Sequence, residues 1–234
     1  TCSSSSITWM PRTVPKMREP YQLIVFDWDG TLLDSAAAIV AAIMGACSDL
    51  GLPRPPEARA RHVIGLGLGD ALRHAVPELP ESDYPRMVER YRHHYLASDH
   101  ELALFDGTAE MIDALAARGR LLAVATGKSR VGLDRALRHS GLGAYFHATR
   151  CADECFSKPH PAMLLELMEE LEVAPECTLM IGDTTHDRQM ARNAGVEGLA
   201  VSFGAHPRAV LEAERPLACV HAPAELAAWL NENA

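Results

Sequence analysis

The sequence lacks several features that would assign it to a specialised class of protein. Within its 234 residues, no apolar stretch approaches the roughly 20 residues that a membrane-spanning helix needs. None of the six cysteines forms a C-x-x-C pair, and no cysteine or histidine pairs stand at the spacing of a zinc site. Internal repeats are absent, and the only low-complexity tract is a short serine run near the start. The sequence therefore predicts neither a membrane span, nor a zinc site, nor a repeat architecture.

Basic residues are fewer than acidic ones. The 22 Lys and Arg residues against 31 Asp and Glu residues give a formal net charge of −9. This balance argues against nucleic acid bound through a basic surface, but a local cation could still bind a phosphorylated metabolite. The densest basic cluster contains Arg86, Arg90 and Arg92. We interpret this cluster as the solvated face of a helix, with a substrate contact as the alternative.

The remaining composition is ordinary for a globular protein. Hydrophobic residues make up 48% and charged residues 23%, and the length suits one large domain or a core with a smaller domain. We expect reduced, structural cysteines and a cytoplasmic location, with a redox pair of Cys151 and Cys155 as the alternative. Residues 1–16 have no apolar stretch of the kind that a signal peptide carries. We predict that they form a flexible extension and that the folded domain begins near Met17.

The most informative segment is D-W-D-G-T at residues 27–31, directly after the apolar run 23–26. Residues two apart in a strand point to the same side, so we expect Asp27 and Asp29 to line one crevice. Paired carboxylates suit a divalent cation, and one could attack an electrophile while the other moves protons. Gly30 allows a tight turn. A D-x-D-G segment by itself is more often a strand end followed by a turn.

Three later segments supply what such a site needs. The apolar run 121–125 ends in T-G-K-S at residues 126–129, whose hydroxyl and backbone N–H groups suit phosphate oxygens. Lys158 follows a polar loop and could supply a positive point charge. The run 178–181 ends in G-D-T-T-H-D at residues 182–187. Because ligands bind beyond the carboxyl ends of the strands in an open parallel sheet, we expect these segments to meet.

In this order, the four segments resemble the four motifs of the haloacid dehalogenase (HAD) superfamily, in its phosphoglycolate-phosphatase-like branch. The resemblance runs from about Tyr21 to about Gly204. It implies a magnesium-dependent phosphatase that hydrolyses a small, phosphoglycolate-like metabolite through an aspartyl-phosphate intermediate. A phosphomutase of the same superfamily and a non-catalytic module that binds a phosphate ligand are the alternatives. A dehalogenase would need neither Asp29 nor a metal. A monomer and a homodimer are both compatible with the sequence.

The resemblance also implies the catalytic roles. Asp27 corresponds to the nucleophile, and Asp29 to the general acid–base, whose proton affinity we expect Asp27 and Asp183 to raise by crowding. Lys158 corresponds to the cation that neutralises charge between Asp27 and the phosphoryl group. The residues expected to bind the substrate are Thr126, Gly127 and Gly30.

Magnesium is the implied cofactor. The resemblance assigns its ligands to the carboxylates of Asp27 and Asp183 and to the backbone carbonyl of Asp29. Asp187, one turn into the next helix, would orient the metal's surroundings or Lys158. An Asp at this position also stabilises the N-terminus of a helix, which is the structural alternative.

Four positions near the motifs need separate interpretation. Trp28 stands where relatives more often carry a smaller apolar residue, and we expect its side chain to point into the core. Gly127 stands where many relatives carry Asn, so a possible side-chain donor is lost. His160 and His186 adjoin motif residues, and we interpret both as exposed or capping histidines.

These patterns predict an α/β fold with a doubly wound parallel sheet, Rossmann-like, and an inserted helical cap. The hydrophobic periodicity predicts helices over 36–50 and 82–97, and no strand signal occurs between residues 34 and 104. From residue 107 onward helices and strands alternate. We therefore assign residues 17–34 and 105–234 to the catalytic core and residues 35–104 to the cap.

The cap contains a glycine-rich segment, Gly65-Leu66-Gly67-Leu68-Gly69. It superficially resembles a dinucleotide-binding fingerprint, but no apolar βαβ pattern surrounds it. In the HAD family, a loop of this kind closes over the substrate. Arg61, His62 and Arg73 lie nearby and could meet an anionic substrate, although a solvated surface role is the simpler interpretation.

Overall fold

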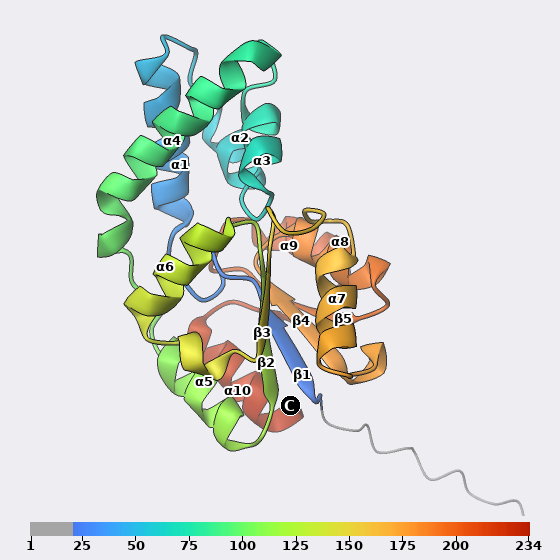
Figure 1. Ribbon diagram of the computed structural model, residues 1–234. Helices are drawn as coiled ribbons and strands as arrows, with labels where there is room; N and C mark the ends of the chain where they lie inside the picture. Colours follow the sequence, from blue (N-terminus) through green and yellow to red (C-terminus); the bar gives the residue numbers. More distant parts are fainter. Residues whose placement is uncertain (1–20) are drawn as a thin grey trace, which may run out of the picture.

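The computed structural model describes residues 21–234, so the expectation of a flexible extension at residues 1–16 lies outside the described part. A parallel sheet with the strand order β3-β2-β1-β4-β5-β6 forms the centre of the molecule (Figure 1). Its middle strand is β1 (Leu23–Phe26), flanked by β2 (Leu121–Thr126) and β4 (Thr178–Gly182). The outer strands are β3 (Ala148–Cys151), β5 (Glu197–Val201) and β6 (Cys219–Val220).

The three central strands carry continuous apolar runs because helices cover both of their faces. All residues of β1 and β4 are buried. Phe26 at the end of β1 pairs with Val124 of β2 and with Ile181 of β4, so these strands end within two residues of one another. The strand order reverses at β1, and such a reversal opens a crevice at the carboxyl edge of the sheet.

Helices on the two faces complete the core. One apolar cluster joins the sheet to α5 (Thr108–Ala117), α6 (Arg130–Ser140) and α10 (Pro223–Asn233). A second joins it to α7 (Ala162–Glu170) and α8 (Thr185–Asn193). This arrangement confirms the doubly wound α/β fold that the sequence predicts. The sequence analysis did not identify β6, α10 or the short helix α9 (Arg208–Ala213).

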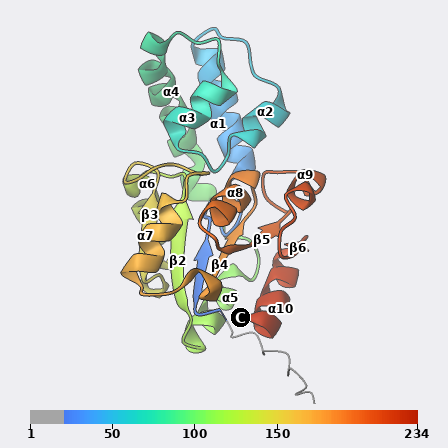
Figure 2. The same ribbon diagram turned by 90° about the vertical axis from the view of Figure 1, so that its right-hand side faces the viewer.

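Four helices form a separate unit above the carboxyl ends of the strands (Figures 1 and 2). They are α1 (Ala36–Asp49), α2 (Glu57–His62), α3 (Leu68–Ala75) and α4 (Tyr84–Ser98). Their buried residues form an apolar cluster of their own, which accounts for a helical insertion that packs apart from the sheet. Short 3-10 helices lie at Glu81–Asp83, Asp99–Glu101, Gly143–Tyr145 and Pro175–Cys177.

Two adjacent connections join this helical cap to the core. The backbone N–H of Asp34 donates to the carbonyl of Ala103 at 3.0 Å, and the N–H of Phe105 donates to the carbonyl of Leu32 at 3.0 Å. The chain therefore leaves the core and returns to it along one short antiparallel pairing.

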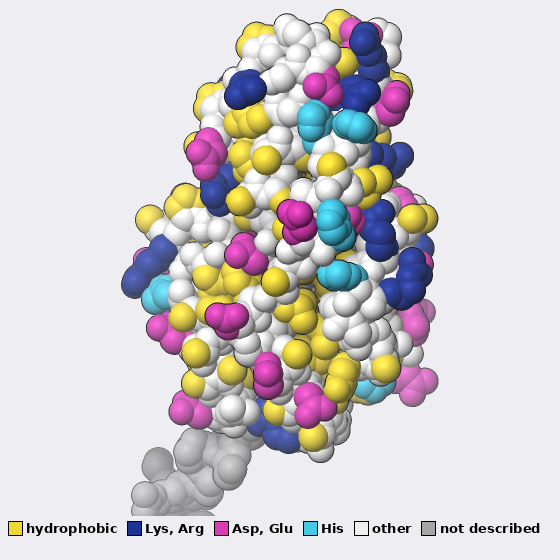
Figure 3. Space-filling model, turned by 90° about the vertical axis from the view of Figure 1, so that its left-hand side faces the viewer, with side chains coloured by type: hydrophobic (Ala, Val, Ile, Leu, Met, Phe, Trp, Pro, Cys, Tyr) yellow, Lys and Arg dark blue, Asp and Glu magenta, His cyan; other side chains and the backbone are white. Residues whose placement is uncertain are grey.

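The structure also bears on the expectations about the cysteines and about membrane spans. The five cysteines among residues 21–234 are free, Cys151 and Cys155 included, which agrees with structural thiols. Over the same residues, no helix combines the length and the apolar composition that a bilayer-spanning segment requires. Acidic and basic side chains are interspersed over the face in Figure 3, without a continuous basic area.

Candidate active site

Three buried carboxylates meet at the carboxyl edge of the sheet. Asp27 follows β1, Asp183 follows β4, and Asp187 lies in the first turn of α8. One carboxylate oxygen from each lies within 4.8 Å of the others. The strand ends bring these residues together, as the sequence predicts.

Lys158, in the loop before α7, lies among these carboxylates. Its Nζ is 2.8 Å from Oδ1 of Asp27 and 2.6 Å from Oδ1 of Asp187. Burial lowers the pKa of Lys158, but the two carboxylates outweigh this effect and raise it above its usual value. Lys158 is therefore a buried, charged ammonium group beside Asp27.

The cluster carries more negative charge than one lysine can neutralise. Burial, followed by repulsion from Asp187, raises the pKa of Asp183 to about 7. Burial also raises the pKa of Asp27 well above its usual value, although Lys158 opposes this shift. Oδ2 of Asp27 is buried and accepts no hydrogen bond from the described residues. Carboxylate oxygens with residual charge are the donors that a hard divalent cation prefers, so this set fits Mg²⁺.

The oxygens of Asp183 are held in place by neighbouring donors. The hydroxyl of Thr31 donates to Oδ1 at 2.9 Å, and the backbone N–H of Ala205 donates to Oδ2 at 2.7 Å. Gly30 lies against the same carboxylate in a left-handed conformation, with φ of +77°. A Cβ atom at residue 30 would lie 2.1 Å from Oδ2 of Asp183, so only glycine fits here. The predicted contact between Gly30 and a substrate stays a prediction.

Asp187 makes both a helix-capping contact and a contact with Lys158, the two alternatives that the sequence left open. The backbone N–H and the hydroxyl of Thr184 donate to Oδ2 of Asp187, at 3.1 and 2.6 Å. These bonds form a capping box at the start of α8. The other oxygen, Oδ1, contacts Lys158. The cap of the helix thus fixes the carboxylate that orients the lysine.

Asp29 does not belong to the carboxylate cluster, contrary to the expectation that it shares a side with Asp27. The Nζ of Lys128 lies 3.0 and 3.1 Å from its two oxygens, and the hydroxyl of Ser35 donates to Oδ1 at 2.7 Å. β1 ends at Phe26, so the alternation of a strand does not continue through Asp29. Asp29 therefore contacts a cation and a hydroxyl, in place of the carboxylates of Asp27 and Asp183 that we expected to crowd it. A metal contact through the Asp29 carbonyl stays a prediction.

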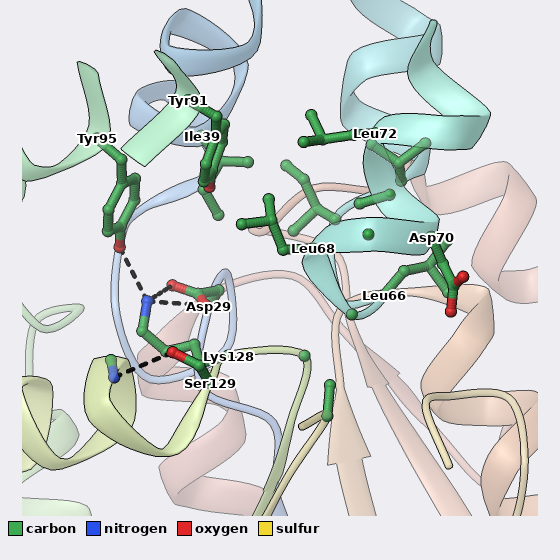
Figure 4. A pocket seen from close by; sticks show the side chains of 18 of the residues that line it. Asp29, Ile39, Leu66, Leu68, Asp70, Leu72, Tyr91, Tyr95, Lys128 and Ser129 are labelled. Carbon is green, nitrogen blue, oxygen red and sulfur yellow. Dashed lines mark hydrogen bonds and ion pairs between the residues drawn. The ribbon is translucent and has the colours of Figure 1, made fainter. Parts of the chain in front are cut away.

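Lys128 is a site residue that the sequence analysis missed, as are Ser35 and Tyr95. It also donates to the hydroxyl of Tyr95, from α4 of the cap, at 2.9 Å (Figure 4). Its side chain is only 10% exposed. Burial lowers the pKa of Lys128, but Asp29 and Tyr95 raise it above its usual value overall. The available signal was a lysine within T-G-K directly after a buried strand.

The backbone of the cap lies directly against Gly127. A Cβ atom there would be 2.4 Å from the carbonyl oxygen of Leu66 and 2.6 Å from that of Gly65. A Cβ atom added to Gly65 would in turn lie 3.7 Å from Oδ2 of Asp27. The glycine-rich segment of the cap therefore covers the carboxylate cluster and leaves no room for a side chain at residue 127. Thr126 is fully buried beside it.

A histidine cluster joins the cap to the core. The Nε2 atoms of His186 and His206 lie 2.8 and 3.1 Å from the carbonyl oxygen of His62 at the end of α2. Nδ1 of His206 accepts from the N–H of Thr185, so both nitrogens of His206 have backbone partners. This bonding favours a contact between cap and core over a metal site.

Two expectations about side chains near the motifs were correct, and one was wrong. Trp28 is fully buried and packs edge to face with Phe146, pointing into the core as expected. His160 caps locally, because its Nδ1 accepts from the N–H of Ala162. His186 is neither exposed nor a cap: it is 8% exposed because the cap packs against it.

The doubly wound sheet carries buried carboxylates and a lysine at the edge where the strand order reverses. This combination is typical of a hydrolase that acts on phosphate esters. The family model of haloacid dehalogenase-like hydrolases matches residues 24–201. The chain belongs to this family, in its phosphoglycolate-phosphatase-like branch, and is a phosphoric monoester hydrolase.

Individual relatives agree with this assignment. The chain is 37% identical to a probable phosphatase, IndB, of Dickeya dadantii (strain 3937), over 83% of this chain and 86% of the relative. It is 34% identical to a phosphoglycolate phosphatase of Agrobacterium fabrum, over 78% of this chain and 81% of the relative. A crystal structure described as a predicted phosphoglycolate phosphatase from Haemophilus somnus 129PT superposes with a TM-score of 0.79 at 26% identity. That superposition covers 88% of this chain and 96% of the other.

Proposed function

We propose that this chain is a magnesium-dependent phosphatase that hydrolyses a small phosphorylated metabolite through an aspartyl-phosphate intermediate. The observation that carries the proposal is the contact of Lys158 with Asp27 inside the carboxylate cluster. A site that only binds a ligand would not need three buried acids and a buried lysine. Burying charged groups costs free energy, so such a cluster is expected where the charged groups serve a common function.

Asp27 is the nucleophile in this proposal. A carboxylate oxygen of Asp27 bonds to phosphorus as the bond from phosphorus to the leaving alcohol oxygen breaks. Lys158 offsets the charge that gathers between Asp27 and the phosphoryl oxygens. Thr126, Gly127 and Gly30 provide hydroxyl and backbone contacts to the phosphoryl group. Magnesium held by Asp27, Asp183 and the carbonyl of Asp29 would supply further positive charge there.

Asp29 is the general acid–base. It protonates the departing alcohol oxygen. It then accepts a proton from the water that attacks phosphorus, while the bond from phosphorus to Asp27 breaks and inorganic phosphate leaves. Its contacts with Lys128 and Ser35 fix its orientation. Transfer of a proton requires the carboxylate to loosen from Lys128, so movement of Tyr95 with the cap is part of this proposal.

The division into a core of residues 17–34 and 105–234 and a cap of residues 35–104 belongs to the same proposal, with the cap closing over the substrate. A phosphomutase would instead pass the phosphoryl group to a second hydroxyl, and a binding module would not need Lys158 and all four acids. A cytoplasmic location and a monomeric or homodimeric state stay predictions.

The test is phosphate release from phosphomonoesters, with magnesium and with EDTA, by the native chain and by Asp183→Asn. We expect EDTA and the substitution each to remove most turnover. Asp106→Asn, which changes an exposed carboxylate, is the matched control and should keep full activity. Unchanged activity under both EDTA and Asp183→Asn would show that the magnesium mechanism is wrong. Transfer of phosphate without its release would identify a phosphomutase.

A further inference from the structure

A cavity of about 630 Å³ lies between the cap and the core (Figure 4). Asp29, Gly127 and Lys128 line its core side, so it adjoins the residues assigned to the leaving group and the phosphoryl group. Cavities of roughly 300–1,000 Å³ enclose ligands of the size of a typical drug molecule. The space is therefore much larger than a two-carbon metabolite needs.

Aliphatic side chains form a wall on the cap side of this cavity, which Asp70, Tyr91, Arg92 and Tyr95 also line. These aliphatic side chains come from α1, from the residue directly after α2, from the glycine-rich segment and from α3, so the wall is formed by the cap's own packing. Its members are Ile39, Ile43, Val63, Leu66, Leu68 and Leu72. Such a wall favours an apolar ligand, since apolar area removed from water contributes roughly 25 cal/mol per Å².

The cations that line the cavity are already engaged or lie in solvent. Lys128 is paired with Asp29, and Arg135 is paired with Asp99 at 2.6 Å. Arg92 has no ion-pair partner among the described residues, but its side chain is exposed. A carboxylate placed against the aliphatic wall would therefore lose its water without gaining a buried partner, which is unfavourable.

Two of the apolar side chains that line the cavity are exposed to solvent. Leu96 on α4 of the cap is 45% exposed, and Val131 on α6 of the core is 73% exposed, and both line the cavity. They are among the few large apolar side chains that the described surface leaves in water. Their position on both sides of the cavity gives an apolar ligand contacts from cap and core together.

We propose that this cavity binds the alcohol portion of the substrate and selects phosphomonoesters whose alcohol is uncharged and carries an apolar ring. The proposal rests on the proposed phosphatase function. It goes beyond that function because it predicts that ring-bearing esters are better substrates than phosphoglycolate. The ring lies against the aliphatic wall, while the phosphoryl group reaches Asp27 past Asp29 and Gly127.

The first test compares three esters that share a primary alcohol as leaving group: 2-phenylethyl phosphate, ethyl phosphate and phosphoglycolate. With magnesium, we expect kcat/KM for 2-phenylethyl phosphate to exceed both others by roughly 10-fold or more. The shared leaving-group type ensures that the difference reports binding of the alcohol portion. A kcat/KM for phosphoglycolate equal to or above that for 2-phenylethyl phosphate would overturn the proposal and leave the phosphatase function intact. No turnover with these esters or with p-nitrophenyl phosphate would overturn both.

The second test uses two matched leucines. Leu96→Lys places a cation in the cavity lining, and Leu165→Lys makes the same change on α7, at 47% exposure and outside that lining. We expect Leu96→Lys to lower kcat/KM for 2-phenylethyl phosphate by about 3- to 10-fold and to leave phosphoglycolate unchanged or improved. Leu165→Lys should change neither. Equal losses for both esters in Leu96→Lys, or the same selective loss in Leu165→Lys, would contradict the proposal. Melting temperatures confirm that both variants fold.

Discussion

The carboxylate cluster of the core and the aliphatic wall of the cap are built in different ways. In the cluster, Lys158, Asp183 and Asp187 are held by short contacts of 2.6–2.9 Å to named partners. The wall has no such bonds, because its leucine and isoleucine side chains are held by packing among the cap helices. The cluster thus fixes the distances between its charged groups, whereas the wall fixes the shape of the cavity.

This difference matches the roles that we propose for the two regions. Attack on phosphorus requires a nucleophile, a cation and donors in one fixed geometry, and rigid strand ends supply this. Selection of an alcohol requires only complementary volume and polarity, which many combinations of aliphatic residues provide. Changes in the core should therefore affect turnover of every ester, whereas changes in the cap should affect one class of ester more than another.

The largest expected effect is that of Asp27→Asn in the core. Without a carboxylate the covalent intermediate cannot form, so kcat should fall at least about 10⁴-fold for every ester. Lys158 keeps Asp187 as a partner, so the fold should be retained. Phosphate-release assays on ring-bearing and small esters measure the effect, with circular dichroism as the control for folding. Residual activity that differs strongly between esters would contradict the assignment of the chemistry to the core and of substrate selection to the cap.

Asp29→Asn should separate the two chemical steps. The leaving group of p-nitrophenyl phosphate departs without a proton, so the first step should survive in part. The second step should slow by roughly 10²–10⁴-fold because water has lost its base. A burst of up to one equivalent of p-nitrophenol should be followed by a near stall, and intact-protein mass spectrometry should detect the phosphorylated chain. A folded variant that binds magnesium but shows neither burst nor adduct would show that Asp29 is not the acid–base.

Gly127→Asn tests the contact between the two regions. An Asn side chain would meet the carbonyl oxygens of Gly65 and Leu66, so the cap segment must shift. We expect the free energy of unfolding to fall by roughly 1–3 kcal/mol, measured by urea denaturation. Gly51→Asn is the control, since a Cβ atom at Gly51 meets nothing within 4 Å and Asn tolerates its positive φ. Equal stability of the two variants would mean that the cap does not rest on Gly127 in solution.

The smallest expected effect is a pH-dependent stabilisation by magnesium. The pKa of Asp183 is raised from 3.8 to about 7, so the fold prefers its protonated form. Its contribution to stability is complete below pH 3.8 and is lost as the pH rises through about 7. Bound magnesium should offset this loss, so the rise in melting temperature that magnesium causes should be larger near pH ~8 than near pH ~5. An equal rise at both pH values, or an equal rise in Asp183→Asn, would contradict this assignment.

The parts of the site that follow from strand ends could be predicted from the sequence. Continuous apolar runs identify β1, β2 and β4, and parallel strands in one sheet bring Asp27 and Asp183 to the same edge. The capping position of Asp187 also follows from local sequence, because the capping box lies within four residues. In each case the decisive contact depends on a regular element with a known period.

The parts that could not be predicted depend on turns and on contacts between distant segments. The pairing of Asp29 with Lys128 depends on how the chain turns after β1, which alternation does not describe. His206 meets the carbonyl oxygen of His62 across 144 residues, and no local pattern indicates such a contact. β6 has only two residues, too few to give a recognisable pattern.

The paired connections at Asp34–Ala103 and Leu32–Phe105 have a consequence for the history of such a chain. Because the two ends of the insertion lie side by side, residues between them can be exchanged without the core having to span a new distance. One recombination event could thus replace the whole substrate-selecting unit while β1 and its aspartates remain in place. An exchanged unit would still have to supply the contacts that Ser35 makes with Asp29 and that Tyr95 makes with Lys128. New specificities can therefore be acquired as modules where these cap positions are kept.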